Sequence, residues 1–212
     1  MVLGARDPEK AESAAKKLSV EGLDVLYRTV DVSEDQSVGR IAAWLEEEIG
    51  KLDVLVNNAG INFDYTQRTS SADLGMVHET LETNLFGAWR VCEALLPLLR
   101  ASDHGRIVNA SSEAGSSFTS PGGMASVGGV LPAYTVSKTA LNAFTVKLAA
   151  DLKDTNILVN AVCPGLVATS PEAEAAGGRP VPEGAASVVW AATLPDDGPT
   201  GGFFRDGEPL SW

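Results

Sequence analysis

The feature that most constrains the fold of this chain is a regular alternation of short apolar segments with helix-like segments. Strand-like segments, rich in aliphatic and β-branched residues, occur at 1–4, 23–32, 52–56, 106–110, 156–162 and 202–204. Helix-forming residues fill the intervening segments 8–18, 33–49, 72–100, 133–153 and 183–192. This alternation is typical of a parallel sheet covered by helices on both faces. It predicts the α/β class, with a doubly wound, three-layer α/β/α arrangement in one domain over residues 1–212.

Several residues mark where the predicted helices begin and end. Pro8 suits a first helical turn, and Ser33 is predicted to cap the helix that follows it. Gly50 is predicted to end that helix. The long helical pattern over 72–100 is predicted to end near Pro97, because proline cannot continue a helix ladder.

Composition excludes several function classes. The chain has 212 residues and a net charge of -12, and so acidic a surface repels phosphate backbones, which argues against nucleic acid as a partner. Cys92 and Cys163 do not have the spacing of a metal site or a disulfide framework. No apolar run is long enough to span a bilayer, and the first residues do not resemble a signal peptide. A cytoplasmic protein with no membrane partner is expected.

Polar and small residues follow two of the predicted strands. The tetrapeptide Asn-Asn-Ala-Gly at 57–60 follows the strand 52–56, and Ser111 and Ser112 follow the strand 106–110. Ligands of parallel sheets bind beyond the carboxyl ends of the strands. A cofactor could approach the tetrapeptide closely, although a simple turn explains the same residues. One of the serines could bind a substrate oxygen, although a loop cap explains them equally well.

Tyr134 and Lys138 lie four residues apart in the predicted helix 133–153. This spacing places both side chains on one face of the helix. A nearby ammonium group lowers the pKa of a phenol, which makes the pair a candidate general acid and base. The competing interpretation is a packed tyrosine and a solvated lysine, because Tyr-x-x-x-Lys alone is a weak motif.

The order of the polar motifs is more specific than any one of them. They are Asn-Asn-Ala-Gly at 57–60, Asn84, Ser-Ser at 111–112, Tyr-x-x-x-Lys at 134–138, Pro164-Gly165 and Thr169. In this order they resemble the short-chain dehydrogenase/reductase family, from about residue 2 to the C-terminus. The ending Pro-Thr-Gly-Gly-Phe-Phe-Arg-Asp-Gly at 199–207 looks like the carbonyl-reductase-like branch. The resemblance implies a Rossmann-like fold and an oxidoreductase that transfers hydride between a nicotinamide and a carbonyl or alcohol substrate.

The resemblance also implies catalytic roles for four residues. Tyr134 would be the general acid of carbonyl reduction and the base of the reverse reaction. Lys138 would lower the pKa of Tyr134 and hold the ribose of the nicotinamide half. Ser112 would bind the substrate oxygen, and Asn84 would support a proton relay from Lys138 to solvent.

A further nine residues at strand ends would contact the cofactor. The resemblance implies contacts with the adenine (Asp31, Val32), with the adenosine ribose and backbone (Asn57, Ala59, Gly60) and with the nicotinamide (Pro164, Gly165, Val167, Thr169).

The residues after the first strand bear on cofactor choice. In this family a basic residue there pairs with the 2′-phosphate of NADP, whereas an acidic residue accepts the ribose hydroxyls of NAD. Arg6 comes first and Asp7 follows it. Because Arg6 comes first, the position resembles the NADP pattern, and NAD is the alternative cofactor. Arg6 could also be a solvated arginine before a helix, with no role in cofactor binding.

The chain departs from the family at its N-terminus. The family opens with a strand and a Thr-Gly-x-x-x-Gly-x-Gly loop that holds the pyrophosphate on a helix N-terminus, and no such motif is present. About 30 residues, one strand and one helix, are expected to be absent, which would leave the neighbours of a central strand with unpaired edges. A misassigned start, a degenerate relative and a fragment are the three explanations, and the first is preferred because the other motifs are intact. The alternative function is a catalytically silent scaffold or partner subunit that binds cofactor poorly.

A second departure is the length of the segment between Ser112 and Tyr134, which are 22 positions apart. Its Gly/Ser-rich part, 111–129, resembles an insertion of monomeric carbonyl reductases, so a monomer and a homo-oligomer are both open. This loop and the Ala/Glu/Gly/Pro-rich stretch 171–186 follow strands and are candidate active-site loops. The expected partner is a small carbonyl or alcohol substrate, and no metal site is expected.

Overall fold

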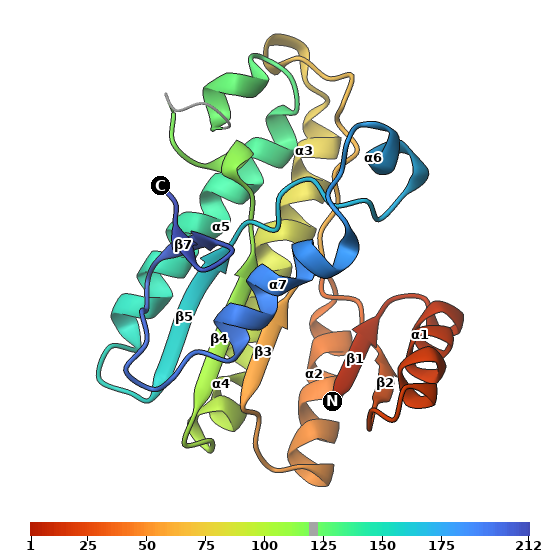
Figure 1. Ribbon diagram of the computed structural model, residues 1–212, viewed down its shortest axis with the longest axis vertical. Helices are drawn as coiled ribbons and strands as arrows, with labels where there is room; N and C mark the ends of the chain where they lie inside the picture. Colours follow the sequence, from red (N-terminus) through yellow and green to blue (C-terminus); the bar gives the residue numbers. More distant parts are fainter. Residues whose placement is uncertain (119–122) are drawn as a thin grey trace.

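The computed structural model describes residues 1–118 and 123–212, and its strands form two sheets (Figure 1). The smaller sheet pairs β1 (Val2–Ala5) with β2 (Leu26–Thr29) in parallel. The larger sheet has the order β3-β4-β5-β6-β7, with β3 (Val54–Asn57), β4 (Gly105–Ala110), β5 (Ile157–Val162), β6 (Phe203–Arg205) and β7 (Glu208–Pro209). All of its strands are parallel except β7, which is antiparallel to β6.

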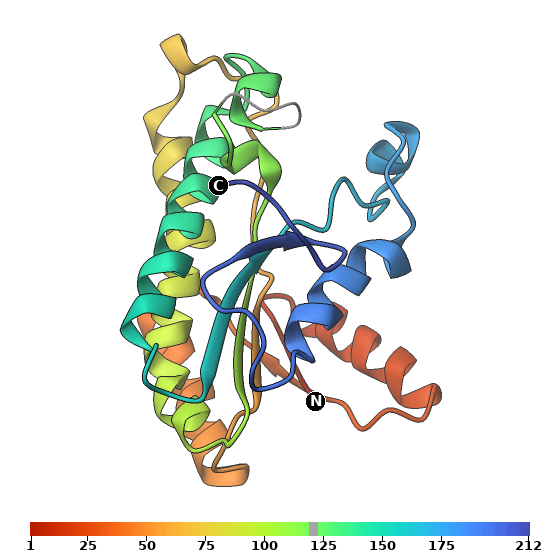
Figure 2. The same ribbon diagram turned by 60° about the vertical axis from the view of Figure 1, so that its left-hand side comes forward.

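Helices cover both faces of the sheets (Figure 2). One face carries α2 (Asp35–Glu48), α4 (Ala88–Arg100) and α5 (Pro132–Asp151). The other face carries α1 (Pro8–Val20) and α7 (Val181–Ala192). The remaining helices are α3 (Leu74–Leu81), which packs against α5, and the short α6 (Pro171–Ala175). The predicted α/β class, with a parallel sheet flanked by helices, is therefore confirmed.

The central strands β4 and β5 form the middle of the core. Ile107 and Val159 are almost completely buried and lie between the helices of the two faces, and Leu99 of α4 and Leu141 of α5 pack in the same cluster. Strands buried on both faces need mostly apolar residues. This requirement explains why 106–110 and 156–162 were recognisable as strands from the sequence.

The described residues contain no ladder between the two sheets. Strand β1 pairs only with β2, and β3 pairs only with β4, so each has one edge without a neighbouring strand. The sequence predicted unpaired edges at these two strands. Among the described helices, none is long and apolar enough to cross a membrane.

The long helical pattern over 72–100 is divided into three parts. A π-helical turn, Glu82–Gly87, separates α3 from α4. The predicted segment 72–100 ends where α4 ends, at Arg100, so the helix continues beyond Pro97. Pro97 removes a hydrogen bond only from the carbonyl of exposed Glu93, while Leu98 and Leu99 beyond it are buried. Burial of these two leucines therefore outweighs the lost bond.

The predicted cap at Ser33 is wrong. The backbone N–H and the hydroxyl of Ser33 both donate to Asp31 Oδ1, at 3.0 and 2.6 Å. The serine is thus part of a local turn, and α2 begins at Asp35 with no side-chain cap. A serine before a helix can adopt either arrangement; here its hydroxyl is directed to the carboxylate of Asp31, and Glu34 is the residue that precedes the helix.

Candidate active site

The candidate site lies at the carboxyl edge of the larger sheet, where three strands end beside the start of α5. Because α5 runs antiparallel to β4 and β5, its N-terminal turns lie at this edge (Figure 1). Asn57 ends β3, and the loops after β3, β4 and β5 carry 58–60, 111–112 and 163–165. The topology therefore gathers the polar motifs that are far apart in the sequence.

Lys138 is buried beside the end of β4. Its side chain is only 6 % exposed, and its ammonium donates to the carbonyl of Ala110 at 2.8 Å. The same nitrogen lies 5.7 Å from the centre of the Tyr134 ring. The structure thus brings Tyr134 and Lys138 together on one face of α5, where the sequence predicted them.

Burial dominates the titration of both residues. It lowers the pKa of Lys138 to about 8, because the charged ammonium is poorly solvated there. It raises the pKa of Tyr134 above the ordinary value for tyrosine, and a hydrogen bond with Ser112 lowers that pKa in part. The sequence predicted that Lys138 lowers the pKa of Tyr134. In the structure, desolvation of the phenol is the largest effect, and it raises this pKa.

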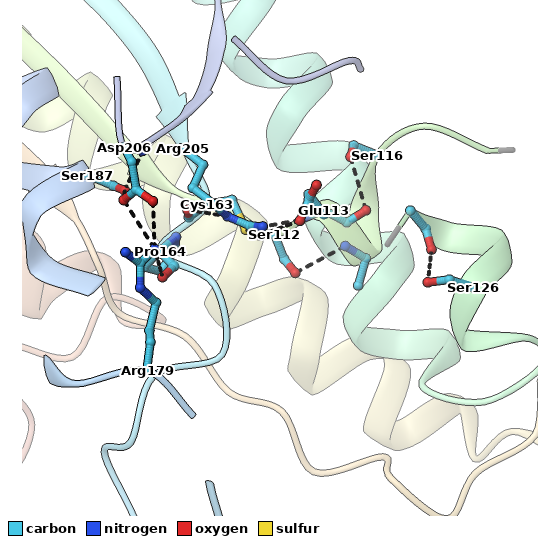
Figure 3. Close-up of polar contacts among 12 residues, drawn as sticks. Ser112, Glu113, Ser116, Ser126, Cys163, Pro164, Arg179, Ser187, Arg205 and Asp206 are labelled. Carbon is cyan, nitrogen blue, oxygen red and sulfur yellow. Dashed lines mark hydrogen bonds and ion pairs between the residues drawn. The ribbon is translucent and has the colours of Figure 1, made fainter. Parts of the chain in front are cut away.

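Ser112 begins a short 3-10 turn, Glu113–Gly115, directly after β4. Its hydroxyl accepts a hydrogen bond from the backbone N–H of Ala114 at 3.2 Å (Figure 3). The same side chain lies close enough to the Tyr134 phenol to lower the pKa of that phenol. The loop cap that the sequence offered for Ser112 is therefore present, and the binding of a substrate oxygen by Ser112 stays a prediction.

Gly115 holds this turn against α5. A Cβ atom at Gly115 would lie 2.5 Å from Cβ of Lys138 and 2.7 Å from the backbone nitrogen of Thr139. Only a residue without a side chain permits so close an approach. The loop that carries Ser112 is thus packed directly on the turn of α5 that carries Lys138.

Asn84 lies in the π-helical turn and is 1 % exposed. Its side-chain oxygen accepts from the N–H of Ile61 at 2.8 Å, and its amide donates to the carbonyl of Ile61 and to Ser137 Oγ, each at 2.9 Å. Ser137 in turn donates to the backbone carbonyl of Tyr134 at 2.7 Å. Irregular π turns recur at functional sites, and this one connects the loop after β3 to the helix that carries Tyr134.

The loop after β3 approaches the same residues. A Cβ atom at Gly60 would lie 3.3 Å from Asn84 Oδ1 and 3.5 Å from Lys138 Nζ. Ala59 precedes it at the carboxyl end of β3. The amide of Asn57 is directed into the sheet, where it donates to Asn109 Oδ1 at 2.8 Å. The side-chain nitrogen of Asn57 is therefore engaged within the sheet, and its contact with the cofactor stays a prediction.

The predicted adenine-end residues lie together after β1 and β2. Arg6 is exposed and close enough to Asp31 to contribute to the lowered pKa of that carboxyl, although the hydrogen bond from Ser33 contributes most. Asp7 caps α1 by accepting from the N–H groups of Glu9 and Lys10. Val32 follows Asp31 and contacts the end of the π-helical turn.

The segment after β5 folds back on itself. Pro164 and Gly165 follow the strand, Val167 forms an isolated bridge with Arg179, and Thr169 N–H donates to the carbonyl of Val167 at 2.7 Å. The Arg179 guanidinium contacts the carboxylate of Asp206 at 2.9 Å (Figure 3). The predicted nicotinamide residues therefore lie in a loop that is fastened to the turn after β6.

Sequence reasoning missed an ion pair next to Ser112. Arg205 at the end of β6 pairs with Glu113, and its guanidinium also donates to Cys163 Sγ at 2.9 Å (Figure 3). A charged residue directly after the two serines was the available signal, but its partner lies 92 positions away. Residues 119–122, within the predicted loop 111–129, lie outside the described part of the chain.

Comparison with known proteins decides the family. The model of the short chain dehydrogenase family matches residues 1–178. The chain belongs to the short-chain dehydrogenase family. This membership agrees with the resemblance identified from the order of the polar motifs.

Relatives of this short-chain dehydrogenase include carbonyl reductases. Short-chain dehydrogenase/reductase 1 of Saponaria officinalis is 33% identical over 263 residues, covering 98% of this chain and 86% of the relative. Carbonyl reductase [NADPH] 1 of Mus musculus is 34% identical over 250 residues, covering 100% and 88%. Among solved structures, the carbonyl reductase Sniffer of D. melanogaster has a TM-score of 0.85 and 26% identity, covering 100% of this chain and 87% of that one. The prediction of a carbonyl-reductase-like member is confirmed.

Proposed function

We propose that this protein is an NADP-dependent oxidoreductase that interconverts a carbonyl and an alcohol, with Tyr134 as general acid and base. The observation that carries the proposal is the convergence of Tyr134, Ser112, Lys138 and Asn84 at one edge of the sheet. The relatives named as NADPH-dependent carbonyl reductases support both the cofactor and the reaction class.

Each residue of this group has a distinct task. Tyr134 gives its phenolic proton to the carbonyl oxygen during reduction and takes a proton from the alcohol in the reverse reaction. Ser112, which lies close enough to Tyr134 to lower the pKa of its phenol, orients the substrate oxygen toward the same phenol. The buried ammonium of Lys138 provides positive charge where negative charge develops on the phenolic oxygen. Asn84 fixes the backbone around Tyr134 through Ser137.

The residues present fit a nicotinamide cofactor at this edge. Gly60 keeps the loop after β3 close to Asn84 and Lys138, so that backbone rather than a side chain faces the site. Lys138 would hold the ribose of the nicotinamide half, and Pro164 and Gly165 would flank the ring. The bound nicotinamide supplies the hydride that is exchanged with the substrate carbon.

Arg6 rather than Asp7 is proposed to face the adenosine end of the cofactor. Asp7 accepts two backbone hydrogen bonds at the start of α1, whereas Arg6 is exposed. An exposed guanidinium recognises a phosphate by charge-assisted hydrogen bonds. This arrangement favours NADP over NAD.

Substitution of Arg6 tests this assignment. We expect Arg6→Ala to raise the Kd for NADPH by about 10- to 100-fold, since a hydrogen bond to a charged group contributes about 1.5–3 kcal/mol. The Kd for NADH, which lacks the 2′-phosphate, should change by less than about twofold. Fluorescence titration with both cofactors measures the two constants, and an equal loss for NADH and NADPH would remove Arg6 from phosphate recognition. Arg40→Ala, an exposed arginine of α2, is the matched control.

The pKa of Lys138 gives a pH dependence. The pKa is about 8, so the ammonium loses its proton as the pH rises through that value. We expect kcat for carbonyl reduction to fall above about pH 8, approaching tenfold per pH unit. Because the pKa of Tyr134 is raised, its phenol stays protonated over this range and does not cause the fall. A rate that is constant between about pH 7 and 10 would contradict the assignment.

Unfolding does not explain the expected loss of rate. The pKa of Lys138 in the folded protein lies below the ordinary lysine value of 10.5. Between about pH 8 and 10.5 the unfolded chain therefore binds more protons at this site than the folded protein does. The contribution of Lys138 to the free energy of unfolding thus rises with pH in this window, and circular dichroism at each pH separates the two effects.

A cofactor titration followed by a carbonyl panel tests the proposed function as a whole. The enzyme should quench or shift NADPH fluorescence on binding and oxidise NADPH in the presence of at least one aldehyde, ketone or quinone. Binding without turnover of any carbonyl with NADPH, or of any alcohol with NADP⁺ in the reverse direction, would favour different chemistry. Absence of NADPH binding by folded protein would favour the alternative of a silent scaffold.

A further inference from the structure

The helix that carries Tyr134 has no capping side chain of its own. The residue before it, Leu131, has a left-handed backbone with φ +55° and no side-chain hydrogen bond to the helix. Pro132 occupies the first helical position and has no N–H. The N–H groups of Ala133 and Tyr134 come next and have no acceptor within the helix. The first turn of α5 therefore needs an acceptor from elsewhere in the fold.

Asp64 provides that acceptor from the loop after β3. Its Oδ2 accepts from the N–H of Ala133 at 2.6 Å and from the N–H of Tyr134 at 3.3 Å. Capping carboxylates usually come from the residue just before a helix, whereas this one comes from 69 positions upstream. The contact joins the loop after β3 to the residue that the proposed reaction uses.

Asp64 is buried, and its hydrogen bonds to the first turn of α5 are the main interactions that offset the cost of burying its carboxylate. The residue is 1 % exposed, and its other carboxyl oxygen is buried without a hydrogen-bond partner among the described residues. Burial of a carboxylate is costly unless hydrogen bonds and nearby positive charge offset it. The orphan N–H groups and the positive end of the α5 dipole provide both.

The same loop is fixed at its other end. Asn84 makes hydrogen bonds to both backbone groups of Ile61, and Ser137 carries the connection to the backbone carbonyl of Tyr134. Asp64 holds the backbone N–H of Tyr134. The two polar groups of the Tyr134 backbone are thus each connected to the segment 61–64, by different routes.

We propose that Asp64 is a positioning residue, whose carboxylate caps the first turn of α5 and so fixes the Tyr134 phenol relative to Ser112. The role rests on the proposed function of Tyr134 as the proton donor. Asp64 acts only through the helix, since its contacts are to backbone N–H groups. Loss of the cap lets the first turn fray, while Lys138, one turn further along, keeps its own bond to Ala110.

Two substitutions at Asp64 test the proposal. We expect Asp64→Ala to lower kcat by about 10- to 100-fold, because small misplacement of a reacting group has effects of this size. The Kd for NADPH should change by less than about threefold. Asp64→Asn keeps an acceptor oxygen of the same shape, and its kcat should stay within about threefold of wild type. Hydrogen exchange of the peptide 131–137 should accelerate at least tenfold in Asp64→Ala only.

Asp73→Ala is the matched control, because Asp73 caps α3 through the N–H of Gly75 at 2.8 Å. It removes a capping carboxylate from a helix without proposed catalytic groups, so kcat should be unchanged. A kcat of Asp64→Ala equal to wild type, or an Asp64→Asn as slow as Asp64→Ala, would overturn the positioning role. If wild type reduces no carbonyl, the proposed function fails by itself. The exchange measurement then still decides the cap, and an unchanged rate in Asp64→Ala would refute it.

Discussion

Replacing Tyr134 by phenylalanine is expected to lower kcat for carbonyl reduction by about 10²- to 10⁴-fold, the usual contribution of a positioned general acid. The substitution removes only the phenolic oxygen, which donates the proton and lies near Ser112. The ring stays in place against the Lys138 side chain. The Kd for NADPH should therefore remain within about twofold of wild type, and steady-state kinetics with a fluorescence titration measures both quantities.

The matched control for this substitution is Tyr27→Phe. Tyr27 lies in β2, in the smaller sheet and outside the candidate site. The same atom is removed there, so general effects of losing a hydroxyl appear in both variants, and kcat should change only in Tyr134→Phe. Turnover that is unchanged in Tyr134→Phe would exclude the tyrosine from proton transfer and leave the family membership untouched.

The central part of the fold could be predicted closely from the sequence. The predicted strand 106–110 corresponds to Gly105–Ala110, and the predicted helix 133–153 corresponds to Pro132–Asp151. These elements are buried on one or both faces, so their residue types follow directly from packing. The short α6 and β7 were missed, because five and two residues are too few to show a period.

The sequence was sufficient to predict which residues of the candidate site lie near one another. Helical spacing places Tyr134 and Lys138 on one face, and sheet topology places Ser112 at the same edge. The pKa values could not be predicted in this way, because spacing gives proximity but not burial. Desolvation dominates at both Tyr134 and Lys138 and raises the first pKa while lowering the second.

The long-range polar contacts explain most of what the sequence did not reveal. Asp64 caps a helix 69 positions away, and Asn84 reaches both Ile61 and Ser137. No local pattern marks such partners. The capping role of Asp7 could have been predicted from the sequence, because an aspartate directly before a proline at a helix start is a capping pattern.

Gly115→Ala is expected to destabilise the protein and to disrupt the site together. The added Cβ would lie 2.5 Å from Cβ of Lys138 and 2.7 Å from two backbone atoms of α5, where no flexible side chain can move away. Overpacking of this kind costs about 1–3 kcal/mol, so the free energy of unfolding should fall by about 3 kcal/mol and Tm by roughly 6–12 °C. Separation of the Ser112 loop from α5 should also lower kcat by about 10²-fold. Urea titration, thermal melting and kinetics test each effect.

Gly39→Ala is the control with the opposite expected sign. Gly39 is exposed in the interior of α2, and nothing lies within 4 Å of the position a Cβ would take. Alanine there should raise the free energy of unfolding by about 0.5–1 kcal/mol, because glycine loses more backbone entropy on folding. Comparing Gly115→Ala with Gly39→Ala separates the effect of adding a methyl group from the effect of where it is added. If Gly115→Ala proved as stable and active as Gly39→Ala, the close contact between the Ser112 loop and α5 would not exist in solution.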